Sequence, residues 1–539
     1  MELIRKIIII ITLISFSIFV LIPSLFVLGY VILDWNKIIK EILYNPLIGN
    51  IYWKDMQRYL WLSFRIAIVT IIIDLLIGLP LAHSLSRKRK LSIVEDLITL
   101  TLVLPTSGFG FAVLITWSTY LRGGEILLPV VNIPLLILIV HIALTLPYVV
   151  RTLTATLRSI EVSYDIVSRS LGASSLTTFR KITLPMILPS LISSITLALT
   201  RSLGETGATL VVAGVNITAS IAIVKWVFEF KYGPAALLSS LLLIISLAVL
   251  LPAEKFSYMK KIRLGKFYSI ERYLIRLERK IPRKVNLLKD TIPLIIFFLL
   301  VIVPITMLVL NVFEYWHYDP YTKRVEGGIV YQLFGPPSYF QKIIEATITS
   351  FIVAILSTII AIYLSLPLVF IIANSGYGKI IRSLLKIPLV IPTSALGLSS
   401  LLFWSNLGIS PSIWLTILTH VIFSVPIIVE TTLSTYRSIN LTPLEETART
   451  LGASPYDILE TITLPLIKRG IIAGAILSFA HSLGETGATF LVMGKDITIP
   501  VLVVNMVEAL AIPAALFTST YLIIISLILL LIIRIIALK

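Results

Sequence analysis

A stretch of 45 residues occurs twice in this chain and constrains its fold more than any other feature. Residues 165–209 and 445–489 align at a constant offset of 280 (445 minus 165) without a gap. The two copies share Leu-Gly-Ala-Ser, Ile-Thr-Leu-Pro and Ser-Leu-Gly-Glu-Thr-Gly-Ala-Thr. Identity this dense predicts two copies of one structural unit.

Composition indicates that this unit lies in a membrane. Of the 539 residues, 57% are apolar and 14% are charged, whereas soluble domains are about 45–50% apolar. The chain also lacks Cys, which excludes disulfides, thiolate metal sites and thiol catalysis. Apolar runs long enough to cross a bilayer predict about twelve spans. They lie near 7–33, 60–85, 97–120, 127–150, 186–212, 234–252, 291–313, 344–373, 384–406, 412–433, 466–493 and 513–537.

The positive charge is distributed as in a membrane protein. A net charge of +17 would favour nucleic acid as the partner of a soluble protein. Here Lys and Arg instead follow the even-numbered spans, and the connector 253–290 holds twelve of them against four acids. The positive-inside rule is then obeyed if both termini are cytoplasmic. We therefore expect a multi-pass protein of the cell membrane that has the lipid bilayer as a partner and binds no nucleic acid.

The connector divides the chain into two halves, 1–252 and 291–539, with six predicted spans each. An even number of spans gives both halves the same orientation, so the repeats are parallel rather than inverted. The expected fold is an all-α polytopic membrane protein, with one polar cytoplasmic loop between the fourth and fifth spans of each half. The aromatic loop 314–342 would lie outside, where it suits a membrane-interface belt or the docking of an external binding protein.

The two polar loops, 158–184 and 438–464, are each predicted to hold two short helices. In the second loop, Thr442 and Pro443 suit a helix start, Gly452 suits its end, and Ser454 before a proline suits the cap of the next helix. Two short helices joined at a glycine would make a rigid knob outside the membrane.

These loops resemble the Glu-Ala-Ala (EAA) loop of ATP-binding-cassette (ABC) importer permeases. Glu446-Thr447-Ala448, Gly452 and the 462–465 Ile-Thr-Leu-Pro match it in the second copy. In the first copy Gly172 matches, but Ile166 stands where the signature has its Glu. The resemblance implies that each knob fits a groove of an ATPase dimer and that an external binding protein delivers the substrate. The residues expected to couple to the ATPase, through exposed charge and the glycine turn, are Asp165, Arg169, Gly172, Glu445, Glu446, Arg449 and Gly452.

The sequence shows no site for ATP or for catalysis of its own. The nearest glycine-rich candidate, 376–379, lacks both the earlier Gly and the following Ser or Thr of a phosphate-binding loop. ATP is therefore expected to bind a separate subunit. We expect no cofactor and no metal, and we interpret His141 and His420, which occupy matching apolar positions, as hydrogen-bonded packing residues.

The Leu-Gly-Glu-Thr-Gly-Ala-Thr segments, 203–209 and 483–489, place a carboxylate inside the fifth span of each half. A charge at mid-bilayer costs about 2.5–3.5 kcal/mol on insertion scales, so these side chains should face the protein interior. Two interpretations stay open. The segments line the pathway or its gate, or they form a structural network between the halves, with Arg201 or His481 pairing a Glu. The residues concerned are Gly204, Glu205, Thr206, Gly207, Thr209, Gly484, Glu485, Thr486, Gly487 and Thr489.

The same motif bears on the substrate. It resembles the corresponding segment of molybdate, tungstate and sulfate permeases, which implies an oxyanion. The fusion of two halves in one chain is similar to iron(III) and thiamine importers, so those substrates stay as alternatives. An ion-coupled secondary transporter is the alternative class, since it also shows parallel repeats. A duplicated polar knob outside the membrane favours the ATP-driven importer.

Overall fold

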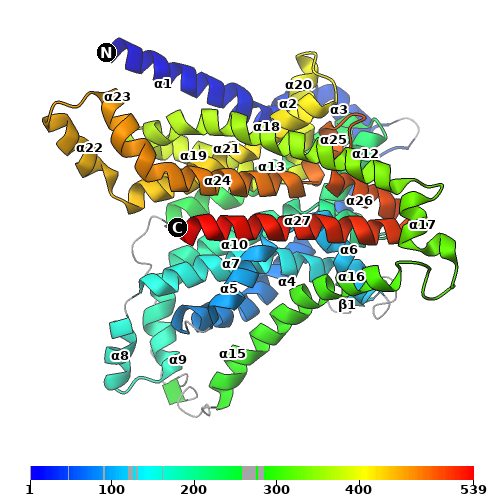
Figure 1. Cartoon of the computed structure of the whole chain (residues 1–539), viewed down its shortest axis with the longest axis horizontal. Coiled ribbons are helices and arrows are strands. Elements are labelled where there is room, and N and C mark those ends of the chain that lie inside the picture. Colours follow the sequence, from blue (N-terminus) through cyan, green and yellow to red (C-terminus); the bar gives the residue numbers. More distant parts are fainter. Residues whose placement is uncertain are drawn as a thin grey trace.

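The computed structural model describes residues 2–45, 48–88, 91–118, 126–128, 132–160, 162–257, 273, 275–276 and 284–538. Most of the connector predicted at 253–290 lies outside these residues. The described chain is helical almost throughout (Figure 1), and its sheet is a single antiparallel pair, β1 (Leu127–Leu128) with β2 (Ile133–Pro134).

Ten helical segments among the described residues are long and apolar enough to cross a membrane. They are α1–η1–α2 (Glu2–Phe16, Ser17–Leu21, Ile22–Leu33), α4 (Ile51–Arg87), α7 (Leu135–Ser159), α9–η4–α10 (Ser175–Thr178, Phe179–Thr183, Leu184–Gly204), α13 (Tyr232–Ser257), α15–η5–α16 (Lys284–Phe297, Phe298–Ile302, Val303–Glu314), α18 (Tyr339–Asn374), α21 (Ile413–Ser438), α23–η7–α24 (Pro455–Ile458, Leu459–Thr463, Leu464–Gly484) and α27 (Ile512–Leu538). The shorter helices are α3 (Trp35–Leu43), α5 (Ser92–Thr101), α6 (Thr106–Trp117), α8 (Val162–Ser170), α11 (Gly207–Val212), α12 (Ala219–Phe228), η6 (Val325–Gly327), α17 (Ile329–Phe334), α19 (Gly378–Val390), α20 (Thr393–Asn406), α22 (Leu441–Thr450), α25 (Gly487–Val492) and α26 (Ile499–Glu508).

The difference from the predicted twelve lies in the third apolar run of each half. The run at 384–406 is the pair α19 and α20, bent by 105°, and counting it as one span gives eleven. The run at 97–120 consists of the short helices α5 and α6. Both breaks fall at a proline, Pro105 or Pro392, which is extended in backbone conformation and precedes a new helix. Proline disfavours helix in the residue before it and removes a backbone donor.

Each half packs its first span against the other half. The α2 helix lies against α20, and α16 lies against α6. At the first of these contacts the Val27 N–H donates to Ser399 Oγ (3.0 Å), and the Phe26 and Phe403 rings meet edge to face with centroids 5.4 Å apart. The two halves are therefore interlocked rather than merely side by side.

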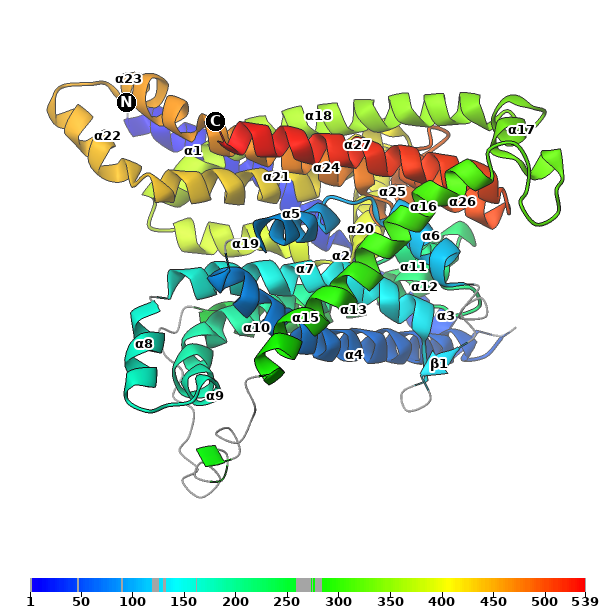
Figure 2. The same ribbon diagram turned by 60° about the horizontal axis from the view of Figure 1, so that its bottom comes forward.

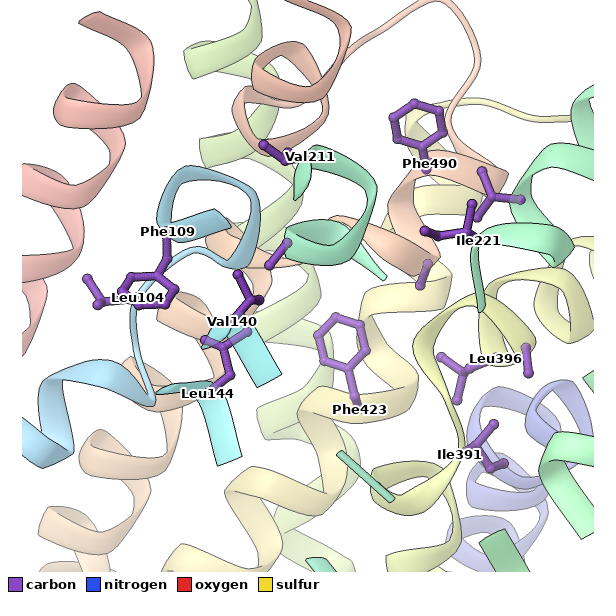
Figure 3. Packing of buried hydrophobic residues seen from close by; sticks show 14 of the residues in the cluster. Leu104, Phe109, Val140, Leu144, Val211, Ile221, Ile391, Leu396, Phe423 and Phe490 are labelled. Carbon is purple, nitrogen blue, oxygen red and sulfur yellow. The ribbon is translucent and has the colours of Figure 1, made fainter. Parts of the chain in front are cut away.

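The buried core is continuous across the halves. The α4, α7 and α10 helices pack together in the first half, and α18, α21 and α24 do so in the second. Figure 3 shows buried residues from both halves in one region, with Val140 and Leu144 on one side of Phe423 and with Ile391 and Leu396 on the other.

The two polar loops lie at one end of the bundle. Figure 2 shows α8 and α9 of the first half and α22 and α23 of the second half at the same end, which is also where the N-terminus lies. Parallel repeats require this arrangement, because an inverted repeat would place its loop at the opposite end.

Candidate functional site

A left-handed glycine closes the first helix of each polar loop. Gly172 has φ +84° and Gly452 has φ +88°. In the second loop the Gly452 N–H donates to Arg449 O and the Ala453 N–H donates to Ala448 O, both at 3.0 Å, and the first loop repeats this pattern. This is the Schellman arrangement, in which a residue without Cβ is favoured. The predicted helix–glycine–helix knob is therefore present in both loops.

A serine caps the N-terminus of the helix that follows each glycine. Ser174 accepts from the Thr177 N–H at the start of α9. Ser454 forms a full capping box with Asp457 at the start of α23. The Ser454 hydroxyl and N–H donate to the Asp457 carboxylate (2.6 and 3.0 Å), which lowers the pKa of that carboxyl. The predicted cap at Thr442 is wrong, because α22 begins one residue earlier, at Leu441.

Glu445 does not offer exposed charge, contrary to the sequence-based expectation. It is 5% exposed, and its carboxylate accepts hydrogen bonds from the Tyr436 hydroxyl (3.1 Å) and the Thr463 hydroxyl (2.9 Å). Tyr436 lies near the end of α21 and Thr463 at the start of α24. Through these two hydrogen bonds Glu445 connects α22 to both membrane helices. The sequence signal that was available is the apolar Leu441 one turn earlier, which is buried on the same face.

The other predicted coupling residues are accessible. Glu446 and Arg449 are exposed in the second loop, while Arg169 is exposed and Asp165 half-buried in the first. The first loop holds its two helices together differently, through a hydrogen bond between the Ser168 and Thr178 hydroxyls (2.9 Å). The two loops therefore differ in their internal contacts as well as in their sequences.

Sequence reasoning missed an apolar contribution at the tip of each knob. Leu171 is 84% exposed and Leu451 is 83% exposed, each directly before the left-handed glycine. Further exposed apolar side chains lie around them in each loop, Ile166 and Val167 in the first and Tyr456 in the second. Exposed apolar groups gathered outside the lipid mark an interaction surface. The duplicated Leu-Gly-Ala-Ser was the signal that could have revealed it.

The second site is a helix break inside the fifth span of each half. The α10 helix ends at Gly204, Glu205 is extended (φ −67°, ψ 121°), and α11 starts at Gly207. The second half repeats this with a break at Glu485 (φ −73°, ψ 126°) between α24 and α25. Each Glu satisfies a freed backbone donor of the new helix, because its carboxylate accepts from the N–H of Ala208 (3.0 Å) or Ala488 (3.1 Å).

The glycines of these breaks form the contact between the halves. A Cβ on Gly204 would lie 2.8 Å from Pro392 Cα, and one on Gly484 would lie 3.1 Å from Pro105 Cα. The two breaks also meet each other: a Cβ on Gly207 would lie 2.7 Å from Thr486 Cβ, and one on Gly487 would lie 2.8 Å from Thr206 Cβ. Only residues without a side chain allow backbones to approach this closely.

The carboxylates of the breaks are paired within their own helices. Arg201 Nη2 lies 2.6 Å from Glu205 Oε2, and His481 Nε2 lies 3.9 Å from Glu485 Oε2. Arg201 and His481 occupy equivalent positions, since 481 minus 201 equals the repeat offset of 280. The predicted pairing of Glu205 with Arg201 is therefore present, His481 lies near Glu485 without a hydrogen bond, and both contacts stay within one half.

His141 and His420 hold the two sides of each break together. His141 Nδ1 lies 2.7 Å from Ser202 Oγ, before the break, and its Nε2 lies 3.1 Å from Thr209 Oγ1, after it. The Thr209 hydroxyl donates to Glu205 O (3.2 Å), so it accepts from His141 Nε2–H. His420 makes the same contacts with Ser482 (2.6 Å) and Thr489 (2.8 Å). The predicted packing role of both histidines is confirmed.

A small cavity lies between the halves beside the break of the second half. It has a volume of about 20 Å³, enough for about one water. It is lined by Thr101, Leu102, Val103, Leu104, Thr106, Leu144, Tyr148 and Arg201 of the first half and by Ala480, His481, Gly484 and Glu485 of the second. The contact between the halves therefore leaves room for about one water beside the break, and Arg201 and Glu485 are among the side chains that line this space.

The chain matches one protein family twice. Residues 74–253 and 365–539 each match the family described as "Binding-protein-dependent transport system inner membrane component". The first matched segment contains the first polar loop and its helix break, and the second contains their counterparts.

Individual relatives match less than half of this chain each. The molybdenum transport system permease protein ModB of Mycobacterium tuberculosis is 32% identical over 203 residues, which are 36% of this chain and 76% of the relative. The sulfate transport system permease protein CysT of Salmonella typhimurium is 34% identical over 195 residues, or 34% and 70%. The molybdate/tungstate transport system permease protein WtpB of Pyrococcus abyssi is 27% identical over 238 residues, or 43% and 87%. The chain is thus a membrane-embedded permease with two repeats, and it belongs to the family of inner-membrane components of binding-protein-dependent transport systems, the permeases of ABC importers.

Proposed function

We propose that this chain forms the complete membrane pathway of an ATP-driven oxyanion importer. In this proposal residues 1–252 and 291–539 are two permease halves, joined by a cytoplasmic connector at 253–290, and both termini are cytoplasmic. The observation that carries the proposal is the presence of two knobs of the same backbone design at one end of the molecule. A protein that needed no partner there would have no use for them.

The knobs are the proposed contacts with an ATPase dimer. Each presents an exposed leucine at its tip together with exposed charge, Leu171 with Arg169 and Leu451 with Glu446 and Arg449. An apolar anchor surrounded by charge is typical of a partner contact. Because the two knobs differ in sequence, each would engage one copy of the ATPase. Glu445 acts from inside, since it links the second knob to α21 and α24 and so transmits its movement to the spans.

The helix breaks are the proposed gate of the pathway. Thr206 and Gly207 face Gly487 and Thr486 across the contact between the halves, and Gly204 and Gly484 pack against Pro392 and Pro105 of the opposite half. Glu205, Thr209, Glu485 and Thr489 support the breaks through hydrogen bonds within their own half. Separation of the halves would open a path here without unfolding either helix, because each break is held within its own half by a histidine. This combines the two interpretations of the motif: a network at rest and a gate when it opens.

The proposed substrate is molybdate, tungstate or sulfate, delivered by an external binding protein. The similarity to the three relatives named above supports an oxyanion over iron(III) or thiamine. The ion pair between Glu205 and Arg201 supports it as well, since an unpaired Glu at the gate would repel an anion.

The test is the ATPase activity of the complex that co-purifies from native membranes on a tag at Lys539. The activity is titrated with molybdate, tungstate, sulfate and iron(III) in the presence of the binding protein. We expect an ATPase subunit to co-purify and an oxyanion to stimulate it. Co-purification of no ATPase with a folded chain would overturn the importer assignment, and stimulation by iron(III) alone would overturn the substrate.

A further inference from the structure

The two halves pair their buried carboxylates with different partners. Glu205 is paired with the permanently charged Arg201, whereas the equivalent Glu485 is paired with His481 at a longer distance. The second half has no permanent cation of its own at this position, and the Arg201 charge of the first half also acts on Glu485. Arg201 is therefore the cation that serves the carboxylates of both halves.

In both pairs the carboxylate is more buried than its partner. The Arg201 side chain is 20% exposed and that of Glu205 is 2% exposed, while His481 is 35% exposed and Glu485 is 6% exposed. Arg201 lines the cavity between the halves and Glu205 does not, so a solute there meets the guanidinium without meeting the carboxylate with which it pairs.

Arg201 lies in the cavity between the two halves of the protein, where an anion would be within its reach. Of the twelve residues that line the cavity, Arg201 carries the permanent positive charge. The Tyr148 hydroxyl of the same half lies beside its guanidinium, and Glu485 of the other half also acts on its charge. A guanidinium has five N–H donors, so its contacts with Glu205 Oε2 and with the Tyr148 hydroxyl leave others for a ligand. Its planar donors match tetrahedral oxyanions, which it binds through two parallel hydrogen bonds.

We propose that Arg201 is the anion-binding residue of the pathway, and that the oxyanion binds its guanidinium when the halves separate. Glu205 then keeps its hydrogen bond with the Ala208 N–H, so its charge remains compensated while Arg201 is shared. The site is single rather than duplicated, because the second half has His481 in the equivalent place. This proposal rests on the proposed function, an ATP-driven oxyanion importer.

Two variants test it in the whole complex reconstituted into vesicles, with the binding protein and labelled molybdate or tungstate. Arg201→His copies the pairing that the second half already uses, so the interface is kept and the permanent charge is lost. The double variant Arg201→Gln with Glu205→Gln removes both charges of the ion pair, so Glu205 is not left as an unpaired carboxylate. We expect both to lower oxyanion uptake per ATP hydrolysed by about tenfold or more, the fold-change that follows from losing a charge-assisted hydrogen bond. Arg151→Gln, which removes an exposed arginine of α7, is the matched control and should retain uptake.

The outcomes separate this proposal from the proposed function. If the wild-type complex transports no oxyanion, the proposed function fails first. If the wild type transports an oxyanion and the double variant does so equally well, Arg201 serves only to neutralise Glu205 and the proposal is overturned. Wild-type uptake by Arg201→His would overturn it in the same way. Loss of uptake in both variants, with binding-protein-stimulated ATP hydrolysis retained, would support it.

Discussion

Replacing Glu445 by alanine is expected to detach α22 from the membrane helices while leaving the spans folded. The carboxylate accepts two hydrogen bonds from buried or half-buried hydroxyls, those of Tyr436 and Thr463. A hydrogen bond to a charged group contributes roughly 1.5–3 kcal/mol. Thr463 keeps a second acceptor in Ile458 O (3.3 Å), so most of the loss falls on Tyr436. The expected destabilisation of the docked loop is therefore about 2–4 kcal/mol.

The assay is hydrogen exchange of the amides in 441–450, measured in detergent with the ATPase absent. A loss of about 2–4 kcal/mol raises the population of the open loop by about 30-fold or more, and exchange rates should rise by the same factor. Glu446→Ala is the matched control. That residue is exposed and adjacent, and its removal should leave exchange unchanged.

The two variants should also separate in the complete transporter. Glu445→Ala is expected to retain contact with the ATPase but to lose the link between ATP hydrolysis and uptake. Glu446→Ala is expected to weaken association with the ATPase itself. Unchanged exchange in 441–450 for Glu445→Ala would refute the reasoning, because it would mean that the two hydrogen bonds do not hold the loop.

Three further predictions concern the glycines and the cap. Gly452→Asp should abolish ATP-driven uptake with the spans intact, because it strains a left-handed position by about 1 kcal/mol and adds charge beside Leu451; normal uptake would contradict this. Gly204→Ala should cost about 1–3 kcal/mol by overpacking against Pro392, whereas Gly29→Ala, with open space around the new methyl, should be neutral in thermal unfolding. Because the folded pKa of Asp457 is depressed, its stabilisation of α23 is present above the unfolded pKa of about 3.9 and is lost as pH falls through the folded value. Ser454→Ala should remove that pH dependence of local exchange, and its persistence would contradict the capping box.

The backbone of the polar loops could be predicted from the sequence because their signals are local. A glycine needed for φ > 0 and a serine that caps the next helix act within a few residues of themselves, so Gly172, Gly452 and Ser454 were identified correctly. The inward direction of the Glu445 side chain was not predicted from the sequence. It depends on Tyr436 and Thr463, which come from two different helical segments, although the apolar Leu441 one turn earlier is a local signal that this face of α22 is buried.

The span count shows the same limit. The length of an apolar run predicts whether it can cross the bilayer, but it does not predict whether the run forms one straight helix or two helices with a bend between them. The 105° turn between α19 and α20 follows from a proline whose effect depends on what packs around it. The packing of each first span against the opposite half could not be predicted from the sequence either. An apolar span has the same composition whichever half it packs against.

The sequence by itself determined that this chain lies in a membrane, that it is built as two parallel repeats, and that each repeat carries a glycine-hinged knob and a carboxylate within its fifth span. Composition, charge distribution and internal identity are properties of the chain alone, and the bilayer and the backbone act on them locally. Only the tertiary structure decided that the two breaks meet, with Gly207 against Thr486 and Gly487 against Thr206. Those facts depend on the distances between helices hundreds of residues apart, which are set by packing and not by any single segment.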